Sequence, residues 1–174
     1  MIVDLTEILE KPKQYRFGLP IEWWESDIPG DQIQGLDKPL EVRITIERIG
    51  SRFAVNGSLN TGLLLQCDRC LDIFHQDLTC EFQVYLESVP DDWEPDEEVE
   101  LLEEEMGVDL IRGEEVELED IIREQIYLSL PMKILCKEDC QGLCPVCGAN
   151  RNRQPCCCQV VQGHPAFQKL KALK

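Results

Sequence analysis

Cysteine is the residue type that suggests chemistry in this chain, because 10 thiols occur among 174 residues. Seven of them lie in one segment of 24 residues, LCKEDCQGLCPVCGANRNRQPCCC, which covers 135–158. The candidates for so dense a set are disulfides, a redox centre, an iron–sulfur cluster and a zinc site. The first residues, MIVDLTE, hold two acids and no apolar run, so we expect a cytoplasmic protein without a secretory signal. Disulfides are rare in a reducing compartment, which favours metal binding or thiol chemistry.

The sharpest metal signal is GLCPVCG, which places Cys144 and Cys147 at C-x-x-C spacing. Pro145 presets part of a tight turn, and Gly148 permits a positive φ, so that backbone N–H groups can approach the sulfurs. A structural zinc takes four tetrahedral ligands, and four thiolates make a closed site. The remaining two ligands are expected from the other cysteines of the segment, which are Cys136, Cys140, Cys156 and Cys158.

A second C-x-x-C motif, CDRC, contains Cys67 and Cys70 far upstream. One alternative joins this pair to Cys144 and Cys147 in a single split zinc ribbon with a long insertion. Another is a thiol-redox or iron–sulfur protein that uses Cys67 and Cys70. A thioredoxin-type motif needs its first thiol at the start of a helix within a βαβ unit, and an apolar β-like run precedes CDRC instead. The choice between zinc and iron stays open at this point.

The elements that must position these thiols begin with a β-hairpin. In EVRITIERI, residues 41–49, apolar and polar side chains alternate with the period of a half-buried strand. Gly50 and Ser51 form an expected two-residue turn, and a second strand over 52–66 leads into CDRC. A third strand is predicted over 78–86, where LTCEFQVYL places Cys80 on the apolar face as a buried small residue and not a ligand.

One amphipathic helix is expected between the strands and the cysteine-rich segment, over about 117–130. The apolar residues of VELEDIIREQIYLSLP recur at spacings of three and four, which gives one apolar stripe. Acids in its first turn complement the helix dipole, and Pro131 ends it.

Within the second strand, Gly57 and Gly62 predict bulges or breaks.

These elements predict an α+β fold: a hairpin-rich antiparallel sheet, one main helix and a C-terminal zinc-binding segment, with a barrel-like form of the sheet left open. The expected organisation has four parts, which are an irregular segment 1–40, a β-rich core 41–135 with an acidic loop 87–105, a zinc-binding cysteine cluster 136–160 and a basic tail 161–174.

The charge of the chain restricts its partners. Its formal net charge is −17, and 87–105 holds 11 acids and no base. Such an acidic surface repels nucleic acid at long range. A role that involves RNA therefore needs either a local contact or an indirect one, through a basic protein that binds the acidic residues. The candidate nucleic-acid contacts are Arg43, Arg48, Arg52, Arg151 and Arg153, together with Lys169, Lys171 and Lys174.

Two classes of function are not expected from the sequence. No window approaches the ~18–20 apolar residues of a membrane span, so no membrane partner is expected. The chain has no P-loop, dinucleotide fingerprint or nucleophile elbow. We therefore expect no small-molecule substrate and no enzyme activity, and an acidic protein-interaction module remains an alternative.

The order of these motifs resembles the YceD family of large ribosomal RNA subunit accumulation proteins. The resemblance rests on CDRCL, the acidic loop, REQIYLSLPMKILC, EDCQGLCPVCGANRN and the final CCC, and it covers roughly 40–174. It implies that Cys67 and Cys70 match the first cysteine pair of the family. The series Cys136, Cys140, Cys144, Cys147, Cys156 and Cys158 matches that of cysteine-rich members, whereas Cys157 departs from the pattern.

The resemblance also implies a function. It points to a non-enzymatic bacterial or plastid factor for 23S ribosomal RNA synthesis, processing or stability. The expected partners are a precursor of the large-subunit RNA or a basic ribosomal protein. The expected cofactor is one structural Zn²⁺, which would stabilise a segment too poor in apolar residues to fold by itself.

Overall fold

The computed structural model describes residues 1–8, 11–25, 30–90 and 107–158. Most of the acidic loop and the whole basic tail, with Lys169, Lys171 and Lys174, lie outside these described residues. No helix in the described ranges is long and apolar enough to cross a membrane.

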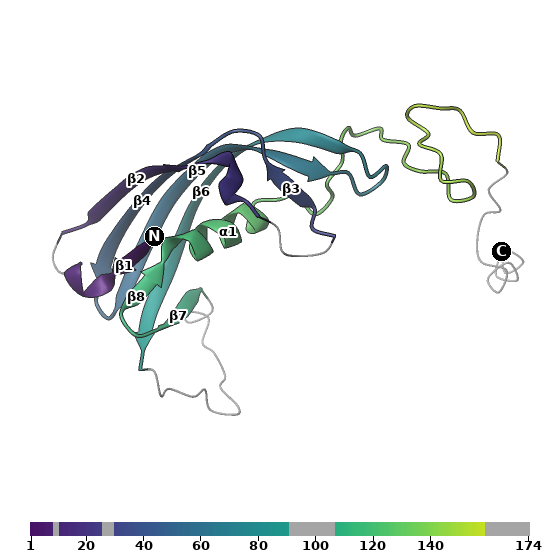
Figure 1. Ribbon diagram of the computed structural model, residues 1–174. Helices are drawn as coiled ribbons and strands as arrows, with labels where there is room; N and C mark the ends of the chain where they lie inside the picture. The colour runs from purple at the N-terminus through teal and green to yellow at the C-terminus, as the bar shows by residue number, and fades with distance from the viewer. Residues whose placement is uncertain (9–10, 26–29, 91–106, 159–174) are drawn as a thin grey trace, which may run out of the picture.

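A long hairpin forms the axis of the molecule (Figure 1). Strand β5 (Arg52–Gln66) pairs along its whole length with β6 (Ile73–Val89), from Arg52 opposite Glu87 to Gln66 opposite Ile73. Strand β4 (Leu40–Ile49) precedes β5 through the predicted Gly50-Ser51 turn, in which Gly50 has a φ of +65°. The CDRC motif lies at the far end of this hairpin.

The main sheet has the order β2-β4-β5-β6-β7, and β3 (Ile33–Leu36) pairs with the end of β5. All pairs are antiparallel except β6 with β7 (Val108–Arg112), which run parallel. A separate two-stranded sheet joins β1 (Ile2–Asp4) to β8 (Glu115–Glu117). The α+β prediction is confirmed, but the described strands form an open sheet with β2 and β7 at its edges and no barrel.

Residues 1–40 carry more structure than the irregular segment predicted from the sequence. Besides β1 and β3, they form β2 (Lys13–Leu19) and two 3-10 turns, η1 (Leu5–Glu7) and η2 (Ile21–Trp23). The prolines do not interrupt β2 because Pro12 and Pro20 lie just outside its two ends. Apolar side chains alternate along β2, so one face of this strand can pack on the core.

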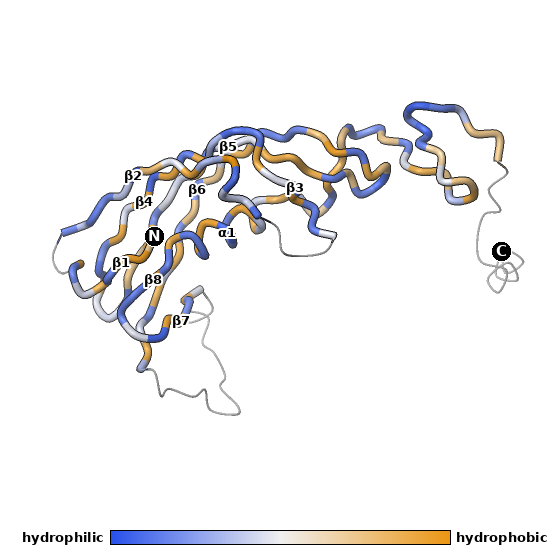
Figure 2. The backbone as a smooth tube through the Cα atoms, viewed as in Figure 1, coloured by the Kyte–Doolittle hydropathy of each residue, from blue (hydrophilic) through white to orange (hydrophobic). Residues whose placement is uncertain are grey.

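The helix α1 (Leu118–Leu128) lies under the concave face of the curved sheet (Figure 1). Its buried side chains are Leu118, Ile121, Ile122 and Ile126, which join one core cluster with the inner residues of the strands. Figure 2 shows the matching alternation of hydrophobic and hydrophilic residues along the strands. The helix ends at a hydrogen bond of 2.7 Å from the Ser129 hydroxyl to the carbonyl of Ile126, just before Pro131.

The glycines of β5 do not break the strand as predicted, since the pairing with β6 continues through both without a shift of register. A Cβ atom on Gly57 would lie 2.2 Å from the ring of Phe82, and one on Gly62 would lie 1.9 Å from a carboxylate oxygen of Asp37. The absence of a side chain therefore makes room for cross-strand groups. The bulge of this region is instead in β3, between Ile33 and Gly35.

Candidate metal centres

Eight of the ten cysteines gather into two groups of four. The proximal site consists of Cys67, Cys70, Cys136 and Cys140, and the distal site consists of Cys144, Cys147, Cys156 and Cys158. Within each group, all four sulfur atoms lie within 4.8 Å of one another. Cys80 and Cys157 belong to neither group.

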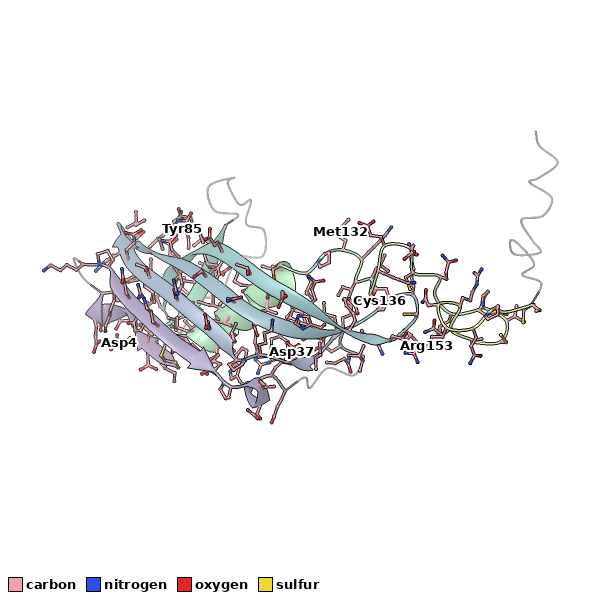
Figure 3. The ribbon with its side chains drawn as sticks, turned by 90° about the horizontal axis from the view of Figure 1, so that it is seen from above. Asp4, Asp37, Tyr85, Met132, Cys136 and Arg153 are labelled. Atoms are coloured by element: carbon pink, nitrogen blue, oxygen red, sulfur yellow. The ribbon has the colours of Figure 1, made fainter. Side chains whose placement is uncertain are left out.

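The proximal site joins two distant parts of the chain. The first pair comes from the turn between β5 and β6, and the second follows α1. Asp68 in that turn fixes the second segment, because its backbone N–H donates to the Ile134 carbonyl at 2.8 Å and its carboxylate accepts from the Ile134 N–H at 2.7 Å. Figure 3 shows Cys136 where the hairpin end meets the cysteine-rich segment.

The sulfur positions of the proximal site fit a tetrahedral metal ion. The sulfur atoms of Cys67 and Cys140 lie 3.8 Å apart, and those of Cys70 and Cys136 lie 3.7 Å apart. Four sulfurs bound to zinc at about 2.3 Å are separated by about 3.8 Å, whereas a disulfide would bring two of them to about 2.05 Å. The four cysteines are free thiols in this geometry.

Burial makes the proximal site a closed one. Cys67, Cys70 and Cys140 are 0%, 3% and 3% exposed, and they pack with Phe74 and Leu135. Cys136 is half-buried, but four thiolates that bind one ion leave no coordination position for a substrate, as in structural zinc sites.

The electrostatics of the proximal thiols favour a cation. Burial raises the pKa of Cys67, but three backbone N–H groups outweigh burial and lower that pKa to about 6. Burial also raises the pKa of Cys70, here to about 12. Without a cation, thiols this close cannot all ionise, because each thiolate disfavours the next. A divalent ion removes that conflict and binds all four as thiolates.

The distal site is built on the tight turn predicted from CPVCG. Gly148 has a φ of +72°, and its N–H donates to the carbonyl of Cys144 at 2.8 Å. The backbone N–H of Val146 donates to the sulfur of Cys144 at 3.4 Å. The sulfur of Cys156 lies 3.3 Å from that of Cys144 and 3.5 Å from that of Cys147, so this group is slightly tighter than the proximal one.

The distal thiols are more exposed than the proximal ones, and their pKa values also differ widely from one another. Backbone N–H groups of Cys147 and Val146 lower the pKa of Cys144 to about 6. Hydrogen bonding to the thiols of Cys156 and Cys147 raises the pKa of Cys158 to about 12. Cys144 is buried, whereas Cys147 is exposed and the other two are half-buried. The distal site could hold an ion with the same four-thiolate chemistry, but in a more open setting.

Hydrogen bonds to the turn of the long hairpin hold the distal site in place. The Asp72 carboxylate accepts from the guanidinium of Arg153 at 2.9 Å and from the Asn150 amide at 2.8 Å. The carbonyl of Arg69 accepts from the Leu143 N–H at 2.9 Å, and Figure 3 shows Arg153 further out along the segment.

The structure forms one of the ligand sets that the sequence allowed, since Cys144 and Cys147 meet Cys156 and Cys158, but it does not form the split ribbon. All six C-terminal candidates lie in a four-thiol group, but they divide between two groups. Cys67 and Cys70 meet Cys136 and Cys140, and not Cys144 and Cys147. Sequence spacing could not separate these pairings, since the return of the chain after α1 decides which pairs meet.

The predicted arginine contacts differ in their surroundings. Arg52 pairs with Glu87 at 2.9 Å, Arg153 pairs with Asp72, and Arg48 lies over the ring of Phe53. The backbone N–H of Arg151, and not its guanidinium, donates to the Gly142 carbonyl. Arg43 lies directly opposite Arg16 of β2. Sequence reasoning missed Arg16, although the alternation of KQYRFGL could have placed it on the outer face.

Comparison with known sequences matches residues 55–174 to the family described as Large ribosomal RNA subunit accumulation protein YceD. The chain belongs to the YceD family. The matched region includes both cysteine sites. No solved structure matches the chain.

Several curated relatives of this YceD-family protein are plant and mycobacterial. It is 26% identical over 140 residues to the chloroplastic large ribosomal RNA subunit accumulation protein YCED homolog 1 of Zea mays, covering 68% of this chain and 48% of the relative. The Arabidopsis thaliana protein of the same name is 25% identical over 143 residues, with coverages of 69% and 44%. An uncharacterized protein of Mycobacterium bovis is 27% identical over 119 residues, with coverages of 67% and 53%. The chain thus spans about half the length of these relatives.

Proposed function

We propose that this protein is a non-enzymatic factor that supports accumulation of the large-subunit ribosomal RNA, through 23S RNA synthesis, processing or stability. The family match over 55–174 supports the link to this RNA. The observation that carries the non-enzymatic part is that each site uses all four of its thiols, which leaves no open coordination position for turnover.

The proposal includes a structural Zn²⁺ in each four-thiol site. Soft thiolates in tetrahedral order suit zinc, and an iron site has the same ligand count. The sulfur spacing of the proximal site fits a single ion better than an iron–sulfur cluster, whose thiolates bind different iron atoms. The thiol-redox alternative for Cys67 and Cys70 has less support, since both are buried and a reactive thiol needs access to its partner.

The proposed partner is a precursor of the large-subunit RNA or a basic ribosomal protein. The net charge of −17 favours a basic protein at long range, whereas RNA would need a local patch of free cations. We propose a compartment in which large subunits are assembled, which is the cytoplasm in bacteria.

The test is the level of 23S RNA and of large subunits in cells that lack the protein. Wild-type protein is expected to restore both and to sediment with large-subunit precursors. The Cys140→Ser and Cys156→Ser variants should restore them less well, because each breaks one four-thiol site. Cys157→Ser is the matched control, since this neighbouring thiol lies outside both groups. Unchanged 23S RNA in the deletion strain would refute the proposal.

A further inference from the structure

The outer face of the sheet, opposite α1, carries two arginines side by side. Arg16 of β2 and Arg43 of β4 are directly opposite residues of an antiparallel pair, and both are exposed. Like charges in this position repel, which costs stability unless an anion lies between them. Among the described residues, no carboxylate forms an ion pair with either arginine.

The pair belongs to a row that crosses four strands. Arg43 lies opposite Ser58 of β5, and Ser58 lies opposite Glu81 of β6. One neighbouring row on the same face contains only neutral hydrogen-bonding side chains, which are Gln14, Thr45, Asn56 and Gln83, and the other contains the exposed acid Glu41. The positive charge of the row therefore lies at its β2–β4 end, and Glu81 lies at its other end.

A hollow of about 380 Å³ lies over the arginine row and the neutral row. Arg16, Arg43, Ser58 and Glu81 are among the residues that line it, together with Gly57. Because Ser58 is small, the guanidinium groups of Arg16 and Arg43 and the Ser58 hydroxyl can contact the same bound molecule.

We propose that Arg16 and Arg43 together bind one phosphate group of an RNA strand that crosses the outer face of the sheet. This inference rests on the proposed function, which supplies RNA as the occupant. Guanidinium groups bind phosphate oxygens through paired N–H donors. The neutral row offers both donors and acceptors, which suits the ribose hydroxyls and base edges of RNA better than the carboxylates of an acidic peptide.

The net charge of the chain sets the strength of this contact. With 34 acids on the chain, long-range repulsion opposes RNA, and two arginines supply the local attraction. Binding is therefore weak, and its salt dependence is shallow, with a slope of about 0.7 for one phosphate contact on a single strand.

The experiment is a fluorescence-anisotropy titration of the full chain with a labelled short single-stranded RNA over a series of salt concentrations. Arg16→Gln and Arg43→Gln should each weaken binding by about tenfold and flatten the salt slope by at most about 0.7, because the two arginines share one phosphate. Arg112→Gln is the matched control, because this exposed β7 arginine carries the same charge away from the hollow. Glu81→Gln should tighten binding, since it removes the acid of the row.

Three results would overturn the inference: no RNA binding by wild-type protein, equal losses for Arg16→Gln and Arg112→Gln, or binding of a labelled glutamate-rich peptide in place of RNA. The outcome is separable from that of the proposed function. If Arg16→Gln/Arg43→Gln protein fails to bind RNA but restores 23S RNA levels in cells, RNA contact here is not how the factor acts. If deletion leaves 23S RNA unchanged, the proposed function fails whatever the titration shows.

Discussion

The sulfur atoms of Cys67 and Cys140 lie 3.8 Å apart, although the two residues are 73 positions apart in the chain. Cys67 directly follows β5, the outgoing strand of the long hairpin, and Cys140 belongs to the segment that returns after α1. In this contact the CDRC pair meets Cys136 and Cys140. The remaining cysteines of the segment therefore form the distal site separately.

The first prediction concerns metal content. Protein purified without added metal should hold two zinc ions per chain, because each four-thiol group can bind one ion. Cys140→Ser should remove one ion and Cys156→Ser the other, as measured by elemental analysis. Cys80→Ser and Cys157→Ser are the controls and should keep both. Loss of both ions in either single variant would contradict two independent sites.

The second prediction concerns the contact between Gly57 and Phe82. Gly57→Ala should lower the free energy of unfolding by about 1–3 kcal/mol, because the added Cβ would lie 2.2 Å from the ring of Phe82. In Phe82→Ala protein the same substitution should cost much less, since the obstacle is gone. A double-mutant cycle by denaturant unfolding measures this coupling, and equal costs in both backgrounds would count against it.

The third prediction uses two positions of the same helix. Ile126→Ala should destabilise the protein by about 2–5 kcal/mol, because Ile126 is 0% exposed in the core. Leu128→Ala, two residues later, should change stability by less than about 0.5 kcal/mol, since its side chain is 70% exposed. Denaturant unfolding of the metal-loaded protein checks both, and similar losses would mean that α1 packs through another face.

The fourth prediction concerns pH. Burial, together with a hydrogen bond of 2.7 Å from its hydroxyl to the Asp31 carboxylate, raises the pKa of Tyr127 to about 12. The unfolded state ionises this tyrosine at about 10, so its contribution to stability is complete below pH 10 and is lost between about pH 10 and 12. Absorbance titration should show one late tyrosine that disappears in Tyr127→Phe. A late step that persists in this variant would show that it does not belong to Tyr127.

The fifth prediction concerns the anchor of the distal site. Asp72→Ala removes the acceptor of Arg153 and Asn150, so amide hydrogen exchange around these two residues should accelerate while metal content stays unchanged. The effect on global stability should be below about 1 kcal/mol, since Arg153 is largely exposed. Asp139→Ala is the control, because this acid makes no side-chain contact with the distal site. Unchanged exchange rates in Asp72→Ala would remove this anchoring role.

The sequence was sufficient for elements with a clear hydrophobic period. The alternation over 41–49 and the stripe within 117–130 depend only on neighbouring residues, and β4 and α1 lie where these patterns predict. Contacts between distant segments could not be derived in this way. A local sequence pattern cannot predict that β7 pairs in parallel with β6, or that Gly57 leaves space for Phe82, because both depend on contacts between distant segments.

The same limit applies to the candidate sites. The spacing of CPVC predicted the turn and the positive φ of Gly148, because both are local properties. The division of the thiols into two groups depends on Asp68 and Ile134, which bring the segment after α1 back to the hairpin. Arg16 and Arg43 likewise meet only through the register of β2 and β4.

The two metal centres differ in how much chain entropy they remove. An ion that joins Cys70 to Cys136 closes a loop of 66 residues that contains β6, β7 and α1, which restricts the unfolded chain by about 4 kcal/mol if it acts as a covalent cross-link does. An ion that joins Cys147 to Cys156 closes a loop of 9 residues, for which the same relation gives about 3 kcal/mol. The proximal ion therefore holds α1 and the long hairpin close together even when the apolar contacts between them loosen. The distal ion orders only the short segment that binds it.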